Sequence, residues 1–340
     1  MEIGVLQKAV KAVMGTSGAK DGELWDYLCF RDGFLTSFNG VAGSVVPLEV
    51  PFTGCLNALK LSALIKDFDD DLWVDLEQHG DWVEIACDQM VAKLPMTQPW
   101  DFPELQPKAP EVVLRGVNIK DAIHDVLFCV SSAKDRPEFY AIGFRGAHVY
   151  GLDGRRLARS LIPGQVEKPF LISRDAAQQI TRAGEPDLLW REGSRFGATY
   201  NESGLMVISS ELATSMPFSA IDTCFAEKKT HVVPTPPGLE NAVARVATMS
   251  DKDESRICLD CDGVTLTVQA RAEYGDASET LIAPFETPFK IWVKAQSLAA
   301  CFRSFKPTRM DFSDVIEGAG RMLRFYNDRA EHCMALMHGA

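Results

Sequence analysis

The sequence predicts an α+β protein built from three similar domains in tandem. Three amphipathic helical stripes recur at nearly even intervals, and a glycine-centred turn follows each stripe at a similar distance. A second helical stripe and further strand-like segments complete each repeat. Because internal repeats reflect repeated structural units, we expect the order helix, hairpin, helix and strands to occur three times.

The first helix of each repeat is predicted by apolar residues at i, i+3, i+4, i+7 and i+8, a spacing that places them on one helical face. The three stripes are Leu6, Ala9, Val10, Val13 and Met14; Ile119, Ala122, Ile123, Val126 and Leu127; and Leu239, Ala242, Val243, Val246 and Ala247. Each helix is therefore expected to bury this face against a sheet.

A hairpin turn is expected after each first helix, at Gly33, Gly146 and Gly263. Each glycine leads into residues rich in β-branched or aromatic side chains, which is typical of the second strand of a hairpin. The segment GLDG at 151–154 predicts a further tight turn, because aspartate and glycine favour turns.

A second helix is predicted in each repeat. Its stripes are Leu61, Leu64, Ile65 and Phe68; Ala176, Ala177 and Ile180; and Leu298, Cys301, Phe302 and Phe305. Strand-like segments surround these helices at 52–59, 73–77, 82–94, 168–173, 188–192, 204–212, 289–293, 310–314 and 322–328. Proline-rich stretches at 99–111 and 231–238 mark domain joints, so the predicted domains are 1–108, 109–230 and 231–340. Three unrelated α+β domains remain the alternative.

The bulk composition is that of a folded protein without a membrane span. A length of 340 residues suits two or three domains, and 46% of the residues are hydrophobic. The sequence has no apolar run of membrane-spanning length and no signal-peptide pattern at its start, so we expect a cytoplasmic protein. Nine dispersed cysteines indicate reduced thiols, and Cys258 and Cys261 would lie on opposite faces of one strand, so no metal site is expected.

The formal net charge of −12 normally argues against nucleic-acid binding, unless the two signs lie on different surfaces. Basic side chains occur on the helix faces that point away from the apolar stripes, whereas most acids lie in strands, loops and linkers. The basic candidates for phosphate contact are Lys8, Lys11, Lys66, Lys120, Arg174, Arg182, Arg245, Arg303 and Lys306. If these helices line one surface, that surface would attract a phosphate backbone.

The segment EFYAIGFRGAHVYGLDGRRLA at 138–158 resembles the second domain of bacterial-type DNA polymerase III β sliding clamps, the processivity factors of replication. Within it, 153–154 and 156–158 fit the family's threonine-aspartate-glycine-histidine-arginine-leucine-alanine run, whereas Leu152 and Arg155 depart at its threonine and histidine positions. Weaker matches lie at 93–105, 208–221 and 239–259, so the resemblance covers the whole chain. The tail CMALMHGA at 333–340 departs from the family's ending, and a divergent phage member is expected.

The resemblance implies the DNA clamp fold, with two helices packed on antiparallel sheet in each of three tandem domains. Two subunits would join head to tail as a closed homodimeric ring, and helices would line a hole around duplex DNA. Such a protein is not an enzyme and needs no cofactor. Its partners would be DNA of any sequence and, through short linear peptides, the DNA polymerase and the clamp loader; a phage-encoded clamp would act in the host cytoplasm.

The resemblance also assigns two sets of contact residues. The implied peptide-binding pocket consists of Leu152, Gly154, Arg155, Arg156, Leu157, Pro236, Val243, Val246, Cys333, Met334, Leu336 and Met337. The expected dimer interface consists of Phe102 and Leu105 on one side and Leu281 and Ile282 on the other. A local core role for these four apolar residues is an equal alternative.

Two other functions are compatible with parts of the sequence. One is a hydrolase that uses carboxylates such as Asp69 and Asp71 with His124, although no nucleophilic triad spacing and no phosphate-binding glycine motif occurs. The other is a repeat-built scaffold that binds peptides without DNA. Such a scaffold would share the pocket but would lack a basic surface lined by helices.

Overall fold

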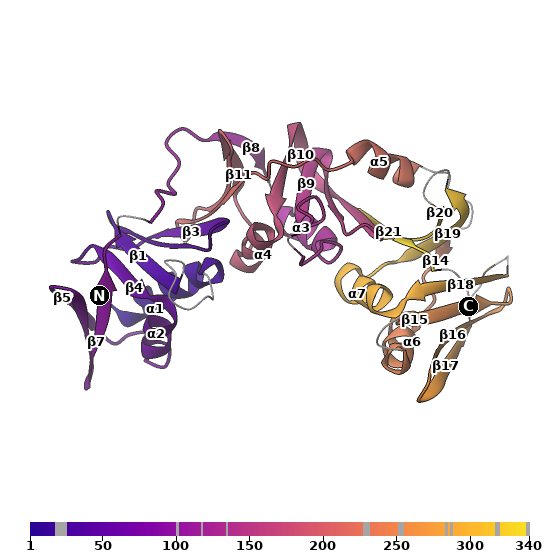
Figure 1. Ribbon diagram of the computed structural model, residues 1–340, viewed down its shortest axis with the longest axis horizontal. Coiled ribbons are helices and arrows are strands. Elements are labelled where there is room, and N and C mark those ends of the chain that lie inside the picture. The colour runs from indigo at the N-terminus through magenta and orange to yellow at the C-terminus, as the bar shows by residue number, and fades with distance from the viewer. Residues whose placement is uncertain are drawn as a thin grey trace. The chain divides into compact units, whose positions relative to one another are not determined.

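The protein, described by a computed structural model, has an α+β fold (Figure 1). The chain divides into two compact units. Unit 1 comprises Met1–Asp121 and Pro163–Ala213, and unit 2 comprises Ala122–Ile162 and Thr214–Ala340. The structure describes residues 1–17, 26–99, 102–116, 118–133, 135–226, 232–250, 255–282, 285, 288–316 and 320–337. The predicted second domain, 109–230, contributes segments to both units, and the three domain boundaries stay predictions.

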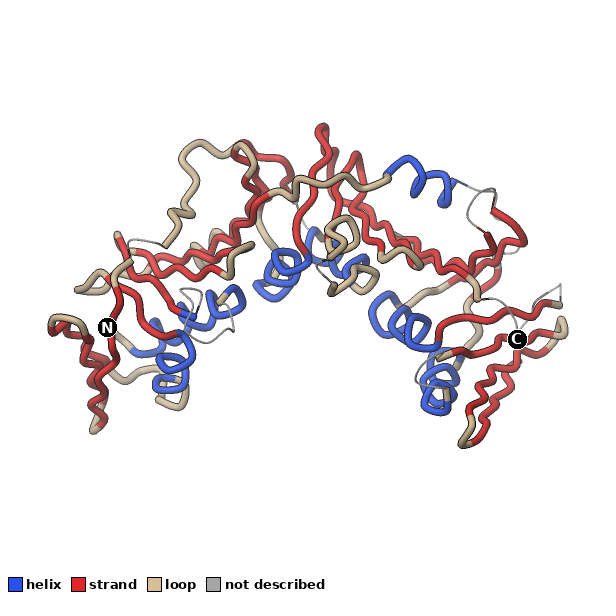
Figure 2. Tube along the Cα trace, in the orientation of Figure 1, coloured by secondary structure: helices blue, strands red, loops and turns tan. Residues whose placement is uncertain are grey.

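Unit 1 contains an eleven-stranded sheet in the order β5-β6-β7-β4-β1-β2-β3-β13-β12-β11-β8. Its strands are β1 (Tyr27–Arg31), β2 (Phe34–Phe38), β3 (Ala42–Pro47), β4 (Gly54–Asn57), β5 (Val74–His79), β6 (Trp82–Cys87), β7 (Met90–Thr97), β8 (Glu111–Arg115), β11 (Leu188–Glu192), β12 (Arg195–Tyr200) and β13 (Leu205–Ser210). Its helices are α1 (Ile3–Val13), the 3₁₀ turn Met14–Thr16, α2 (Ala58–Ile65) and α4 (Arg174–Ala183). Figure 2 shows α1 and α2 side by side.

Unit 2 contains a six-stranded sheet, β14-β19-β20-β21-β10-β9, and a four-stranded sheet, β17-β16-β15-β18. The strands are β9 (Ala141–Leu152), β10 (Arg156–Ser173), β14 (Val233–Pro234), β15 (Arg256–Cys261), β16 (Thr265–Ala272), β17 (Gly275–Ile282), β18 (Phe289–Lys294), β19 (Arg309–Ile316), β20 (Gly320–Tyr326) and β21 (Ala330–Ala335). The helices are α3 (Ile119–Leu127), α5 (Phe218–Ala226), α6 (Leu239–Val246), the 3₁₀ turn Ala247–Met249 and α7 (Ala295–Phe305). The first residues of α3 and the second half of β10 belong to unit 1.

All six predicted helices are present, because each apolar stripe finds a sheet to cover. The α6 stripe, including Leu239 and Val243, packs with the α7 stripe, including Leu298 and Phe302, in the core of unit 2. Side-chain caps define two helix starts: the Asn57 Oδ1 accepts a backbone N–H at the start of α2, and the Ser173 hydroxyl does the same for α4. The helix α5 is an addition that the repeat pattern does not predict.

The predicted hairpin turns are correct at two of the three glycines. Gly33, with φ of 76°, lies between β1 and β2, and Gly263, with φ of 100°, lies between β15 and β16. The prediction for Gly146 is wrong: this residue lies within the range of β9, with φ of 57°, and β9 continues to Leu152. Glycine can adopt such a left-handed conformation inside a strand, so its presence alone does not mark the end of the strand.

Two strand pairings join segments that are far apart in the sequence. In the unit 1 joint, β3 pairs antiparallel with β13, so that Val45 lies opposite Met206. In the unit 2 joint, β10 pairs antiparallel with β21, so that Ala158 lies opposite His332. Both joints carry a sheet from one repeat into the next, and each lies wholly within one unit.

Candidate functional site

The turn between β9 and β10 is built around Asp153. Its Oδ1 accepts the backbone N–H groups of Arg155 at 3.0 Å and Arg156 at 2.8 Å, and its Oδ2 accepts the Arg156 Nε–H at 2.8 Å. Gly154 has φ of 85°, and a Cβ there would lie 3.1 Å from the Phe139 ring, so both the conformation and the space favour glycine. GLDG is therefore the tight turn that the sequence predicts, and Arg156 helps to hold it closed.

The turn is attached to the C-terminal strand. In the unit 2 joint, Arg156 lies opposite Met334 and Leu157 lies opposite Cys333. The Ala335 N–H also donates a hydrogen bond to the Arg155 carbonyl oxygen, at 2.9 Å. Two stretches of the implied peptide pocket, one from the middle of the chain and one from its end, are thus adjacent in unit 2.

The implied pocket residues differ widely in accessibility. Leu152, Pro236, Val243, Val246, Cys333 and Met334 are buried; Arg156, Leu157, Leu336 and Met337 are half-buried; Gly154 and Arg155 are exposed. Val243 and Val246 belong to the buried stripe of α6 and pack in the core of unit 2 together with Met334. A helix face that fills its own core has no free surface for a ligand, so the accessible side chains belong to the turn and the tail.

A buried histidine lies next to this turn. His332 on β21 is fully buried among the rings of Phe128, Phe305 and Phe325, whose centroids lie 5.0 to 6.2 Å from its own. Neither ring nitrogen has a hydrogen-bond partner among the described residues. Burial lowers the pKa of His332 to about 3, and the positive charge of Arg156 acts in the same direction. The sequence pattern identifies no role for this residue, because a lone histidine in a strand carries no motif.

The predicted DNA-contacting residues all lie on helices or directly after them. Lys8, Lys11, Lys66, Arg182, Arg245, Arg303 and Lys306 are exposed, and Lys120 and Arg174 are half-buried. Lys8 and Lys11 lie on α1, away from its buried stripe, and Arg303 lies in the last turn of α7. The helices therefore present positive side chains to solvent, as the sequence predicts for their polar faces.

Acidic residues lie close to several of these cations. The Lys8 Nζ is 3.6 Å from an Asp70 carboxylate oxygen, and the Lys66 Nζ is 3.9 Å from the carboxylate of the next residue. The Arg245 Nε donates to Glu279 at 2.9 Å, and this hydrogen-bonded pairing raises the pKa of Arg245 and lowers the pKa of Glu279. Exposed pairs contribute little stability, but each one partly balances a local positive charge.

The four expected interface residues occupy two different environments. On β17, the edge strand of the four-stranded sheet, Leu281 is half-buried and Ile282 is 83% exposed. Phe102 and Leu105 are buried in unit 1, where they pack against side chains of the eleven-stranded sheet. Only the β17 pair thus presents apolar surface that a partner chain is able to cover.

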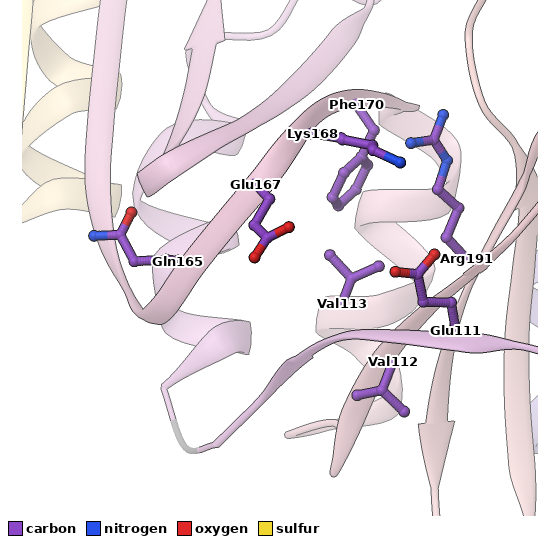
Figure 3. Close-up of a pocket in the computed structure, with 8 residues that line it drawn as sticks. All are labelled: Glu111, Val112, Val113, Gln165, Glu167, Lys168, Phe170 and Arg191. Carbon is purple, nitrogen blue, oxygen red and sulfur yellow. The ribbon is translucent and has the colours of Figure 1, made fainter.

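A polar cavity of about 220 Å³ lies in unit 1, between β8 and the second half of β10 (Figure 3). It is lined by Glu111, Val112, Val113, Gln165, Glu167, Lys168, Phe170 and Arg191. Two carboxylates, Glu111 and Glu167, and two cations, Lys168 and Arg191, line it, and Glu111 lies opposite Arg191 in the strand register. None of the predicted site residues belongs to this cavity.

In the part of the chain that the structure describes, no group of three or more His, Cys, Asp or Glu side chains is arranged to hold a metal ion. No helix there is both long and apolar enough to cross a membrane.

Comparison with solved structures identifies the fold. The chain is similar to a DNA polymerase sliding clamp from Pseudomonas aeruginosa solved with a ligand, at 16% identity and a TM-score of 0.84, covering 100% of this chain and 99% of that one. It is similar to the DNA polymerase III β subunit from Thermotoga maritima, at 12% identity and a TM-score of 0.85, with the same coverage. A sliding clamp from Bartonella birtlesii bound to griselimycin is 14% identical, with a TM-score of 0.86 and the same coverage.

These comparisons show that the chain has the sliding-clamp fold over its full length. No protein-family model matches the sequence, and a search of curated proteins also finds no match. At these identities the similarity lies in the backbone arrangement, which conserves the α+β architecture while most side chains differ.

Proposed function

We propose that this protein is a non-enzymatic DNA sliding clamp, a ring that encircles duplex DNA and tethers a replicative polymerase. The observation that carries the proposal is the coverage of the structural match. The match includes 100% of this chain and 99% of each of two solved clamps. In this proposal the repeats 1–108, 109–230 and 231–340 act as three clamp domains. Two copies of the chain then supply the six domains of the ring.

The two joints within the chain suggest how the ring would close. Each one pairs a strand of one repeat with the last strand of the following repeat: β3 with β13, and β10 with β21. In the third repeat, the strand that corresponds to β3 and β10 is β17, and it has no following repeat to pair with. In the first repeat, the strand that corresponds to β13 and β21 is β7, and it has no preceding repeat to pair with. Among the described residues β17 pairs with β16 alone, and β7 pairs along its length with β6 and meets β4 only at Met96 and Thr97.

We therefore assign the head-to-tail contact to β17 of one copy and β7 of the other. Leu281 and Ile282 would lie in this contact, where the exposed Ile282 side chain would be covered. Phe102 and Leu105 would not touch the partner directly, because they are already buried against their own chain. They would support the sheet from within unit 1.

DNA would be held by the basic helix faces without sequence recognition. Lysine and arginine contacts to phosphates depend on salt and carry no base information, which suits a protein that slides. The residues proposed for this role are Lys8, Lys11, Lys66, Lys120, Arg174, Arg182, Arg245, Arg303 and Lys306. The acidic remainder of the chain would disfavour other contacts with DNA.

Short linear peptides of the polymerase and the clamp loader would bind at the turn and tail of unit 2. Arg155, Arg156 and Leu157 would contact the peptide together with Leu336 and Met337, which are accessible at least in part. Buried Leu152, Pro236, Val243, Val246, Cys333 and Met334 would form the supporting layer below them, and Gly154 would shape the turn. Arginine beside apolar and methionine side chains suits peptides with both apolar anchors and polar flanks.

The test is retention on DNA of different topology. A clamp loaded onto a nicked circle should stay bound in moderate salt and should be released when the circle is linearised. Reversal of four helix charges together, Lys8→Glu, Lys66→Glu, Arg174→Glu and Arg303→Glu, should weaken retention without unfolding. A control variant carries four reversals outside the helices and outside β7 and β17, Arg115→Glu, Lys108→Glu, Lys168→Glu and Arg271→Glu, and should be retained like wild type.

Three outcomes would reject this function. They are equal retention on linear and circular DNA, equal loss in the two charge-reversal variants, and a monomer by light scattering at concentrations where clamps act. Peptide binding without any retention on circles would favour the scaffold alternative.

A further inference from the structure

Two cysteines face each other across neighbouring strands in unit 1. In the antiparallel register of β1 and β4, Cys29 lies directly opposite Cys55. Both are free thiols, and both are buried, at 1% and 0% exposure. Residues directly opposite in an antiparallel pair have Cα atoms about 4.5 or 5.5 Å apart, and both separations lie within the range that a disulfide accepts.

The electrostatics of the pair distinguish its two sulfurs. A hydrogen bond from the Cys55 thiol is the main influence that lowers the pKa of Cys29, and the positive charge of Arg31 acts in the same direction against the effect of burial. The same hydrogen bond, together with burial, raises the pKa of Cys55. Because the thiolate is the reactive form of cysteine, Cys29 is the better nucleophile of the two.

The apolar cluster that contains the pair is small. Cys29 and Cys55 form a small cluster with Phe102, and Tyr27 and Phe38 pack against its sides. Phe102 belongs to the irregular segment that follows β7, so the buried ring that packs on the two thiols comes from a linker. Segments of this kind open locally at a lower free energy than core strands do.

Solvent approaches this cluster from one side. A cavity of about 370 Å³ is lined by residues 102–106 of the linker and by Arg31, Asp32, Thr36 and Val45. Thr36 is the cross-strand neighbour of Cys29 on β2, on the side opposite Cys55. Phe102 lines this cavity and also belongs to the cluster of Cys29 and Cys55, so movement of this one ring would connect the cavity with the thiols.

We propose that Cys29 and Cys55 are an oxidisable dithiol that closes into a cross-strand disulfide when the linker at Phe102 lifts. The oxidant is a peroxide. The Cys29 thiolate attacks one peroxide oxygen and breaks the O–O bond, which yields a sulfenic acid and, after protonation, one water. The Cys55 thiol then attacks the Cys29 sulfur and displaces the second water, so that two thiols lose two electrons and two protons to one hydrogen peroxide.

The strand registers single out this pair. Cys258 lies opposite Gln269 and Trp292, and Cys261 lies opposite Leu266 and Phe289. In the registers that the structure describes, Cys29 and Cys55 are the one case of cysteine opposite cysteine. The remaining thiols therefore serve as internal controls.

The experiment treats the folded full-length chain with hydrogen peroxide, blocks free thiols with an alkylating reagent and maps the peptides by mass spectrometry. The expected product is a cross-linked peptide pair that contains Cys29 and Cys55, has lost two hydrogen atoms and is cleaved by dithiothreitol. Cys29→Ser and Cys55→Ser should each abolish it, whereas Cys258→Ser should leave it unchanged. In Cys55→Ser, Cys29 should instead accumulate as sulfenic acid, trapped by dimedone.

The role of the linker is tested by Phe102→Ala, which should speed cross-linking several-fold because it uncovers the thiols. Phe52→Ala is the matched control, since Phe52 is also a buried ring of unit 1 but packs against Phe30 and is absent from the thiol cluster. If Phe102→Ala folds poorly, Phe102→Leu provides a smaller opening. Absence of the cross-link, or equal acceleration by Phe52→Ala, would overturn the proposal, and neither result depends on DNA binding.

Discussion

The unit 1 joint and the unit 2 joint perform the same strand pairing with different side-chain chemistry. In unit 1, Val45 of β3 and Ile208 of β13 pack with Leu105 of the linker and with Trp190. Leu105 fills the space above Gly43, where a Cβ would lie only 2.2 Å from its Cδ1. The linker is fastened further by Arg195 and Glu192, which bind its backbone.

The unit 2 joint depends instead on charged side chains. Arg159 of β10 donates to Glu331 of β21 at 2.8 Å. Arg329 donates to Asp125 of α3 at 2.6 Å, and the same carboxylate accepts the Ser160 hydroxyl at 2.9 Å. The Asp125 side chain is almost fully buried, so this cluster is an ion pair set into the joint.

This difference teaches that one topology tolerates two kinds of stabilisation, which respond differently to conditions. Apolar packing does not depend on charge. Buried charges and a buried neutral histidine make the free energy of unfolding depend on pH, and partly exposed ion pairs make it depend on salt as well. We therefore expect acid and salt to weaken the unit 2 joint selectively.

The largest expected effect is acid destabilisation of unit 2 through His332. Its pKa is lowered from 6.5 to about 3 in the folded state, so the unfolded chain binds a proton that the native state excludes. The stability contributed by neutral His332 is present above about pH 6.5 and is lost as the pH falls toward 3, by on the order of 5 kcal/mol in total. Hydrogen exchange of residues 330–335 should rise in this range before that of residues 42–47.

The matched variant for this prediction is His332→Leu, which removes the titration and keeps an apolar side chain. Its free energy of unfolding should vary less between pH 6.5 and pH 4 than that of wild type. The assignment is wrong if both proteins lose stability in parallel, since other groups would then cause the acid effect.

The second effect concerns the apolar joint. Leu105→Ala should lower the free energy of unfolding of unit 1 by about 3 kcal/mol, because it leaves a cavity above Gly43 and beside Trp190. Urea unfolding at low and high salt should give the same difference from wild type. Leu161→Ala, at an exposed position of β10, is the control and should change stability little. A strongly salt-dependent result would show that the linker is held mainly by its charged contacts.

The sequence pattern was sufficient for the helices and for most strands, because each element carries its own periodicity. It missed β3, β8, β12, β14, β17 and β21, and it missed α5, whose buried Ile221, Cys224 and Phe225 lie outside the repeated plan. Local pattern also does not reveal that Ser209 pairs with Ala42, since that register depends on the whole sheet. The Gly146 error has the same origin, because a left-handed glycine suits a turn and an irregular strand equally.

The site was predictable to a lesser degree. The turn at Asp153 and Gly154 follows from residue chemistry, and the exposed lysines follow from helix faces. The burial of Val243 and Val246 was implicit in the sequence, since both belong to the stripe that predicts α6, and a stripe that covers a core does not also line an open slot. The burial of Phe102 and Leu105 was not implicit in the sequence, because the path of an irregular linker depends on the sheet below it.

The third effect is removal of the buried carboxylate. Asp125→Ala should destabilise unit 2 by about 2 kcal/mol. This loss is smaller than that expected on breaking a fully buried ion pair, because the Arg329 side chain left behind is 40% exposed and is able to regain water. Asp260→Ala removes the partner of Lys290 in an exposed pair and should change stability by less than about 1 kcal/mol. Equal effects of the two variants in thermal unfolding would show that the buried position of Asp125 has no special importance.

The smallest effect tests whether the charges of the unit 2 joint act across the strands. Glu331→Gln should lower the free energy of unfolding by about 1 kcal/mol at low salt, because both partners of the Arg159 pair are partly exposed. The difference from wild type should shrink as salt is added, whereas the Leu105→Ala difference should not. A double-mutant cycle with Arg159→Gln isolates the pair: a coupling free energy near zero at low salt would mean that β10 and β21 are held by backbone pairing and packing, as in unit 1, and that the two joints differ in appearance only.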